Sequence, residues 1–382
     1  MLGELEGERS DGHVGEAGCN AHVETVNHCP LHQRSGPKWP HFPGEHVQRY
    51  PEAARNAARL TTFYDAFSRL ASGNEGAPLQ DVMLDPSLLH HDRPSLDYSA
   101  VREAYAGSFN KHFVASVPFV LEEQCRMGAA LLDYCRHIRH KTENAPSVYT
   151  LGDGAGVMAR ALSEASAQAI ATLNCSPNPE NRDEFLRKPA ENSFFFLGPF
   201  FELTAGRRAA MGNGVFRSGF DVVIEDTTFQ MYGRERLAPI ALTMQHLKSD
   251  GILILHEKLM HPDPDDFHRR EVQKDELFKA RYFAESQIGQ KKQGILRSMH
   301  EQLVTLTELT EVLQRFFDHA VVTWNSGNFY TIAASTSISR LQLFTQCLTP
   351  PAIPADFLYE DLPRVLFSAV NHAAFPEFRS PR

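Results

Sequence analysis

The chain has 382 residues, of which 42% are hydrophobic and 22% charged, as is ordinary for a soluble globular protein with a substantial core. Its net charge of −9 and the lack of any dense lysine and arginine run argue against nucleic acid as the main partner. No apolar run approaches the roughly 20 residues of a membrane helix. The acidic N-terminus also lacks the basic and apolar regions of a secretory leader. We therefore expect a cytoplasmic protein that binds neither nucleic acid nor membrane.

Residues 1–43 are rich in Gly, His, Glu and Pro and show little apolar periodicity, so we expect a poorly ordered tail. Within it, Cys19, His22, Cys29 and His32 form two C-x2-H pairs with six residues between them. Zinc binds such residue types, but this interval is much shorter than that of a zinc finger. We therefore prefer a histidine-containing tail to a metal site. All the cysteines, at positions 19, 29, 125, 135, 175 and 347, are expected to be reduced thiols.

Residues 44–144 are predicted to form a helical N-terminal region. Apolar residues recur at three- and four-residue steps from Pro51 to Leu70 and again from Leu121 to Ile138. Between these stretches, four aromatic residues lie at about helical spacing, and core packing is the ordinary interpretation of such a pattern. The alternative is that one or two of them line a ligand pocket. They are Tyr105, Phe109, Phe113 and Phe119.

From residue 145 onward, predicted strands alternate with predicted helices, which is typical of a parallel sheet with crossover helices. One of these helices, Glu235–Leu247, is expected to stop at Lys248-Ser-Asp-Gly251. A densely charged segment, 262–300, interrupts the alternation and is predicted to form one or two exposed helices, either a lid or a plain solvated face. The five expected strands are Val148–Leu151, Ala169–Asn174, Ser193–Leu197, Asp221–Glu225 and Gly251–His256.

The alternation ends in a predicted β-hairpin. Ala320–Trp324 and Phe329–Ala334 are β-rich runs, and Asn325-Ser-Gly-Asn328 between them supplies turn residues. The remaining segment, 337–382, is predicted to add two helices around a Pro350-Pro351 break.

A glycine turn follows the first predicted strand in Thr150-Leu-Gly-Asp-Gly-Ala-Gly156. Glycine adopts positive φ readily and lets a ligand approach the backbone, and the next helix would present free N–H groups to that ligand. The pattern predicts a nucleotide-like ligand. Gly154-Ala-Gly156-Val-Met-Ala159 also satisfies the G-x-G-x-x-A pattern of dinucleotide-binding proteins, although about 20 residues further on Asn174 stands where those proteins carry an acid.

Five parallel strands that end in a helix and an antiparallel hairpin resemble the class I S-adenosylmethionine-dependent methyltransferase fold. The resemblance covers about 150–335 and rests on the glycine turn, on Phe220-Asp-Val-Val-Ile-Glu-Asp226 and on Leu247-Lys-Ser-Asp-Gly-Ile-Leu-Ile-Leu255. It implies a Rossmann-like α/β domain over 145–336, with a mostly parallel seven-stranded sheet and an antiparallel C-terminal hairpin. It also implies that the helices of 44–144 close over the cofactor.

The resemblance further implies S-adenosyl-L-methionine as cofactor. Carried over position by position, its binding residues are Gly152, Asp153, Gly154, Gly156, Asn174, Cys175, Pro199, Phe200 and Thr227. This chain departs from the family at three positions that usually carry a carboxylate or lie near one: Thr150, Asn174 and Pro199. Asp153 and Glu202 are the nearest available substitutes.

Candidate catalytic residues lie at the predicted ends of strands four and five, because ligands of open α/β sheets bind beyond the carboxyl ends of the strands. Asp226 and Glu225 are candidate ligands of the reacting groups, with a helix N-cap as the ordinary alternative. His256 is a candidate general base or else a structural histidine. Asp226 and Glu257 are hard oxygen ligands for a divalent cation, but the sequence offers no third ligand, and we assign no metal.

The sequence thus predicts methyl transfer to a small-molecule acceptor by in-line displacement, in a pocket closed by the N-terminal helices. Two alternatives stay open: an NAD(P)-binding oxidoreductase, and a non-catalytic methyltransferase-like scaffold, which the missing carboxylates motivate. The N-terminal helices are also a possible homodimer interface.

Overall fold

The computed structural model describes residues 44–139, 145–370, 375 and 377–379. The expected tail over 1–43, with its Cys19, His22, Cys29 and His32, lies outside these residues. None of the helices in the described part combines the length and the hydropathy needed to cross a bilayer.

The N-terminal region is helical, as its periodicity predicts. Aspartates begin two of its helices: Asp85 accepts a hydrogen bond from the Ser87 N–H and Asp92 one from the Ser95 N–H, which satisfies N–H groups that a helix leaves free. Most of the last and longest helix is buried. The helices are α1 (Gly44–Arg55), α2 (Ala58–Ala71), α3 (Pro86–Leu89), α4 (Arg93–Glu103), α5 (Ser108–Val114) and α6 (Val120–Arg139).

The described residues form one sheet of eight strands in the order β3-β2-β1-β4-β5-β7-β6-β8. The first five strands pair in parallel, and β6 and β7 form the antiparallel hairpin, which confirms the Rossmann-like arrangement. The strands are β1 (Ser147–Leu151), β2 (Ala171–Ser176), β3 (Ser193–Leu197), β4 (Phe220–Asp226), β5 (Leu247–Lys258), β6 (His319–Ser326), β7 (Phe329–Ser335) and β8 (Arg364–Ser368).

The prediction of seven strands was wrong by one. β8 lies in the segment for which a second C-terminal helix was expected, and it pairs antiparallel with β6. Its five residues carry no decisive local pattern. The open edge of β6 supplies the hydrogen bonds that make it a strand.

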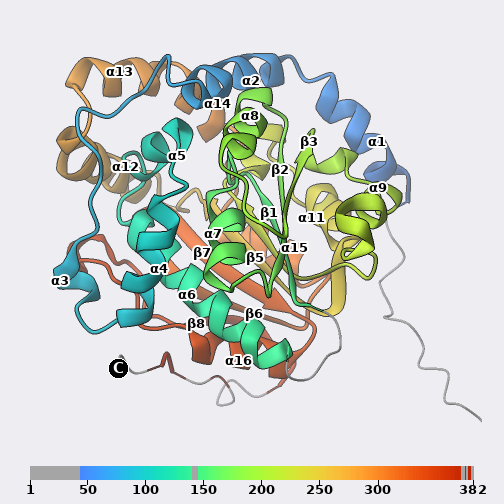
Figure 1. The fold of residues 1–382 in the computed structure, drawn as a ribbon. Helices are drawn as coiled ribbons and strands as arrows, with labels where there is room; N and C mark the ends of the chain where they lie inside the picture. Colours follow the sequence, from blue (N-terminus) through green and yellow to red (C-terminus); the bar gives the residue numbers. More distant parts are fainter. Residues whose placement is uncertain (1–43, 140–144, 371–374, 376, 380–382) are drawn as a thin grey trace, which may run out of the picture. The chain divides into compact units, whose positions relative to one another are not determined.

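Helices cover both faces of the sheet (Figure 1). Because side chains alternate along a strand, Tyr149 and Leu151 of β1 belong to one hydrophobic cluster and Val148 belongs to the other. The first cluster includes residues of α1, α2, α11 (Leu237–Met244) and α15 (Leu306–Leu313), and the second includes residues of α4, α6, α7 (Val157–Ala165) and α16 (Ile338–Cys347).

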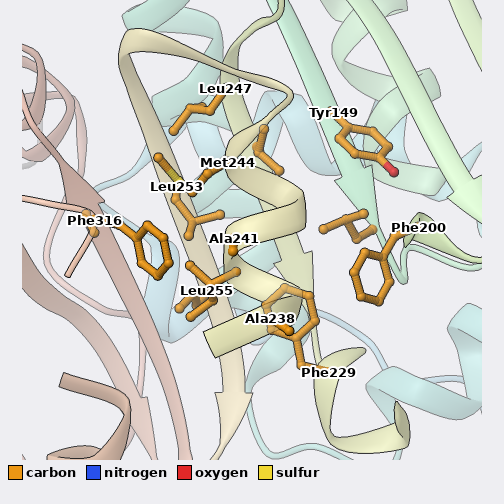
Figure 2. Close-up of a cluster of buried hydrophobic side chains, with 14 of the residues drawn as sticks. Tyr149, Phe200, Phe229, Ala238, Ala241, Met244, Leu247, Leu253, Leu255 and Phe316 are labelled. Carbon is orange, nitrogen blue, oxygen red and sulfur yellow. The ribbon is translucent and has the colours of Figure 1, made fainter. Parts of the chain in front are cut away.

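Figure 2 shows α11 against the sheet, with Ala238, Ala241 and Met244 near Leu253 and Leu255 of β5. This helix ends at Met244, and β5 begins at Leu247. The expected helix to Leu247 was therefore too long, because Lys248-Ser-Asp-Gly251 already belongs to the strand. Three further short α-helices connect the parallel strands: α8 (Pro179–Arg187), α9 (Ala205–Ala210) and α10 (Phe229–Tyr232).

The charged segment 262–300 contains three α-helices, α12 (Pro264–Gln273), α13 (Glu285–Gln293) and α14 (Ile295–His300), with two short helical turns over Lys274–Arg281. The expectation of exposed helices holds for parts of α12 and α13, where Asp265, Arg269 and Lys292 are exposed, and fails for four charged residues within 271–279. Glu271, Lys274, Asp275 and Lys279 are all buried, because they form ion pairs with one another and with Lys258.

Arg126 of α6 forms a buried ion pair within its own helix and a hydrogen bond to the sheet. Its guanidinium lies 2.7 Å from the Glu123 carboxylate, with side-chain exposures of 0% and 3%, and it also donates to the Thr323 and Thr349 carbonyls. Arg126→Met leaves Glu123 buried without a partner. We expect it to lower the free energy of unfolding by about 3 to 5 kcal/mol, measured by urea denaturation.

The control is Arg136→Met, the same change on the same helix at a side chain that is 67% exposed. It should cost less than about 0.5 kcal/mol. Equal effects of the two substitutions would show that the buried contacts of Arg126 do not contribute to stability.

Candidate functional site

The glycine turn after β1 has the backbone that its sequence predicts. Gly152, Gly154 and Gly156 have φ values of 87°, 51° and 74°, a region that side chains with a Cβ rarely adopt. A Cβ on Gly154 would lie 2.6 Å from Phe109 Cδ1, and one on Gly152 would overlap Thr228 and the Asp226 carbonyl. Each position therefore requires glycine for both conformation and space.

Asp153 occupies the N-terminus of the helix that follows. Its carboxylate accepts hydrogen bonds from the Met158 N–H at 2.8 Å and the Ala159 N–H at 3.2 Å. Burial raises the pKa of Asp153 to about 6, against the lowering effect of these two bonds, so the group is mostly ionised at neutral pH. The N–H groups at the start of α7 are thus partnered from within the chain.

Asn174 and Thr150 lie beneath the turn. The Thr150 hydroxyl donates to Asn174 Oδ1, and Asn174 Nδ2 donates to the Gly154 carbonyl, both at 2.9 Å. Both side chains are buried. Two of the positions where the family usually carries carboxylates are therefore used here to join β1, β2 and the glycine turn.

A small cavity of about 40 Å³ lies against the turn at the ends of β1, β2 and β3. Four predicted cofactor ligands line it: Gly152, Gly154, Cys175 and Phe200. Gly156, Asn174 and Pro199 do not line it, and Asp153 lines a separate cavity behind the turn. The other residues that line the cavity of about 40 Å³ include Tyr64, Phe67 and Phe109 from the N-terminal helices. They also include Ser176, Asn178 and Asn181, which lie between the end of β2 and the first turn of α8.

A much larger pocket of about 760 Å³ adjoins this cavity. The two share Phe67, Phe109, Gly152 and Met231 as lining residues. Asp226 and Thr227 at the end of β4 line the large pocket, together with residues of α2, α5, α13 and α14. The structure therefore places two contiguous spaces on either side of Gly152.

The two acids at the end of β4, Glu225 and Asp226, have different roles. One oxygen of Glu225 accepts hydrogen bonds from the Phe229 and Thr228 N–H groups, so Glu225 caps α10. Burial, and then the charge of Glu257, raises the pKa of Glu225 well above its usual value. Asp226 instead lines the large pocket. One of its oxygens is buried and has no hydrogen-bond partner, and burial raises its pKa well above the usual range. Thr227 follows with φ of 49°, a strained conformation of the kind found at binding sites.

His256 is brought beside Asp226 but not into the large pocket. The two residues are register partners on β4 and β5, and both line a buried cavity of about 30 Å³ with Asp153 and Gln124. His256 Nδ1 lies 3.2 Å from the Thr331 hydroxyl, and its Nε2 has no partner. Burial lowers its pKa to about 3, so the ring is neutral at physiological pH.

Glu257 faces the other side of the sheet. It forms a buried ion pair with Arg236 at 2.9 Å, and its carboxylate is therefore already neutralised. The pair of Asp226 and Glu257, considered above as cation ligands, is not assembled at one site.

Sequence reasoning missed the lysines of the large pocket, which are Lys258, Lys274, Lys279 and Lys291. Three of them lie in the segment expected to be exposed, and nothing in the local sequence marks their burial. The aromatic pattern gave a partial signal. Phe109 and Phe113 line the large pocket, whereas Phe119 packs against Phe278 and Phe357.

No protein-family model matches the chain, and no curated protein matches it. Among solved structures, the plantazolicin methyltransferase BpumL, in complex with a monoazolic desmethylPZN analog and SAH, aligns with a TM-score of 0.42 and 11% identity over 77% of this chain and 98% of that chain. A SAM-dependent methyltransferase from Aquifex aeolicus aligns with a TM-score of 0.31 and 12% identity over 54% and 89% of the two chains. Another, from Geobacter sulfurreducens in complex with S-adenosyl-L-homocysteine, aligns with a TM-score of 0.32 and 16% identity over 59% and 73%. These similarities are too low to support an argument about function, and the description of the fold rests on the strand order of this chain.

The placement of Asn174 can be tested by restoring the acid that the family usually carries. Asn174→Asp removes the donor to the Gly154 carbonyl and puts a carboxylate where the residue is fully buried. We expect a loss of about 1 to 3 kcal/mol in the free energy of unfolding, measured by chemical denaturation.

Asn192→Asp is the matched control, since it also removes an amide donor to a carbonyl, that of Gln168, but at an exposed site. It should cost less than about 1 kcal/mol. If Asn174→Asp instead left stability intact and tightened binding of an adenosyl ligand, Asn174 would be a ligand residue and not part of the support beneath the turn.

The neutral, buried His256 predicts a pH dependence of stability. Between its unfolded pKa near 6.5 and its folded pKa of about 3, the unfolded chain binds a proton that the folded chain does not. Stability therefore falls as pH falls below 6.5, by up to about 1.4 kcal/mol per pH unit for this one group. His256→Gln should reduce the slope of unfolding free energy between about pH 6 and about pH 5 by that amount. An unchanged slope would mean that the ring accepts a proton in the folded state.

Proposed function

We propose that this chain is an S-adenosyl-L-methionine-dependent methyltransferase that acts on a small molecule. The observation that carries the proposal is the carboxylate of Asp153 at the start of α7. A dinucleotide places its pyrophosphate on such a helix N-terminus. Here the Met158 and Ala159 N–H groups are already bonded to Asp153, and the carboxylate would repel a phosphate. A sulfonium cofactor with an ammonium group carries the opposite charge and is compatible with this turn.

The residues around the small cavity suit an adenosyl ligand in their chemistry. Phe200 offers an aromatic face for an adenine ring. Asn178 and Asn181 offer amide oxygens that accept hydrogen bonds from ribose hydroxyls, and the glycine turn allows close approach of the ligand to the backbone. When bound, the cofactor supplies a methyl group that is already activated for displacement.

The cavity volume sets a condition on binding. About 40 Å³ is far below the roughly 300 Å³ at which ligand pockets begin. Phe67 of α2 and Phe109 of α5 line it, and Phe109 lies against Gly154. We infer that these two rings move aside when the cofactor enters. The helices that carry them, α2 and α5, then cover the bound cofactor.

The large pocket then holds the acceptor on the other side of Gly152. The chain contributes alignment of the two reactants and exclusion of water. Asp226 is the catalytic residue that we assign, because it alone among the predicted catalytic candidates lines this pocket. Burial raises its pKa well above the usual range and so favours the protonated form. We infer that this form donates a hydrogen bond that orients the acceptor. His256, behind Asp226, is a positioning residue.

The two alternatives are less well supported. Besides Asp153, the antiparallel β6–β7 hairpin argues against an NAD(P)-binding oxidoreductase, whose sheet continues with parallel strands. A non-catalytic scaffold has no need for a pocket of about 760 Å³ next to the cofactor cavity.

Calorimetric titration tests the proposal. We expect heat of binding with S-adenosylhomocysteine and none with NAD(P). Gly154→Ala adds a methyl group 2.6 Å from Phe109 at positive φ, and we expect it to weaken S-adenosylhomocysteine binding about tenfold or more, since such strain costs about 1 to 2 kcal/mol.

Gly289→Ala makes the same change in α13, where the new Cβ meets nothing within 4 Å, and should leave binding unchanged. Binding of NAD(P) in place of the sulfur ligand would overturn the proposal. Binding without turnover on any acceptor would favour the scaffold.

A further inference from the structure

Four lysines line the large pocket. Lys258 at the end of β5, Lys274 and Lys279 in the turns after α12, and Lys291 on α13 all line it. These residues come from three separate elements. The tertiary fold alone gathers them around one space.

Carboxylates neutralise only part of this charge. Glu271 lies 2.7 Å from both Lys258 and Lys274, and Asp275 lies 3.2 Å from Lys274 and 3.4 Å from Lys279. In the described part of the chain, these two acids are the only carboxylates within ion-pair distance of the four lysines. Lys274 contacts both carboxylates and is therefore neutralised. The positive charge that the two carboxylates leave over is carried by the other three lysines.

The remaining charged groups of the pocket do not cancel this excess. Arg69 and Glu75 pair with each other at 2.8 Å. Burial disfavours the charged form of Asp226 and raises its pKa well above the usual range. Lys291 contacts the His112 ring and lies 4.9 Å from the centre of the Phe283 ring. Neither contact supplies negative charge.

Keeping these lysines charged is costly in the structure as it stands. Lys258 is 5% exposed and Lys279 is 2% exposed. Burial, and then the neighbouring Lys274, lowers the pKa of Lys258 to about 7 and that of Lys279 to about 8. Burial alone lowers that of Lys291 to about 8. An anion in the pocket would offset this cost by pairing with them.

Apolar side chains form another part of the lining, which leads toward the cofactor side. It includes Phe113, Met231, Leu296, Met299 and Phe329. Met231 and Gly152 also line the small cavity. A ligand that fills the pocket therefore meets positive charge in one part and apolar side chains in another.

We propose that the methyl acceptor carries an anionic group, a carboxylate or a phosphate, which Lys258, Lys279 and Lys291 bind while an apolar body extends toward Gly152. Calling this ligand the acceptor rests on the proposed function. The anion site itself does not, because it is defined by the pocket and its lysines alone.

The test is calorimetric titration at low ionic strength with three probes that share one alkyl chain: octanoate, octyl phosphate and neutral octanamide. We expect at least one of the two anions to bind about tenfold or more tightly than octanamide, as hydrogen bonds to charged groups favour. The stronger of the two identifies the anionic group as carboxylate or phosphate. We expect the same affinity in the presence of saturating S-adenosylhomocysteine.

Lys291→Gln and Lys188→Gln form a matched pair. Lys291 lines the pocket, whereas Lys188 does not line it, is exposed and donates to the Ala104 carbonyl. Lys291→Gln should weaken binding of the preferred anion about fivefold or more and leave octanamide unaffected. Lys188→Gln should change neither.

Three results would overturn the proposal: no preference for either anion over octanamide, equal effects of the two substitutions, or competition between the anion and S-adenosylhomocysteine. The last would mean that the lysines bind the cofactor's own carboxylate. Failure of S-adenosylhomocysteine to bind at all, with anion binding intact, would contradict the methyltransferase function and leave the anion site standing.

Discussion

The left-handed turn at Gly152, Gly154 and Gly156 is the constraint on which the rest of the site depends. Its conformation is held from beneath by the Asn174 amide, which donates to the Gly154 carbonyl, and from behind by Asp153, which bonds the first N–H groups of α7. Both partners are buried, and a buried polar group without a partner costs more than the bond itself gains. The turn, the start of α7 and the end of β2 are therefore fixed as one unit. This unit forms the boundary that the two pockets share.

This arrangement changes what the departures from the family pattern mean. Thr150 and Asn174 are not simply weaker versions of cofactor-binding carboxylates, because both side chains are committed to hydrogen bonds inside the protein. The polar groups nearest the small cavity come instead from the β2–α8 connection, at Ser176, Asn178 and Asn181. The support of the turn and the contacts to a ligand are thus carried by different residues.

The strand ends show how a sheet sorts residues that are adjacent in sequence. Glu225 and Asp226 are neighbours, as are His256 and Glu257, but successive side chains on a strand point to opposite faces. Asp226 and His256 meet in one buried cavity, while Glu257 pairs with Arg236 on the other face. The sequence identified these four residues as one group near the reaction centre. The sheet divides them, and only Asp226 reaches the large pocket.

The sequence by itself determined the order of strands and helices, the parallel core with its hairpin, and the glycine turn, because each depends on local patterns: periodicity, β-rich runs and the freedom of glycine at positive φ. Only the tertiary structure decided that β8 completes the sheet, because an edge strand is defined by its partner. It also decided that the charged segment after β5 turns inward. A lysine in a polar stretch is expected to be exposed unless its carboxylate partner is known, and Glu271 comes close to Lys258 only after the chain has folded. Burial of this charge depends on pairing in three dimensions, which the linear spacing of the two residues does not encode.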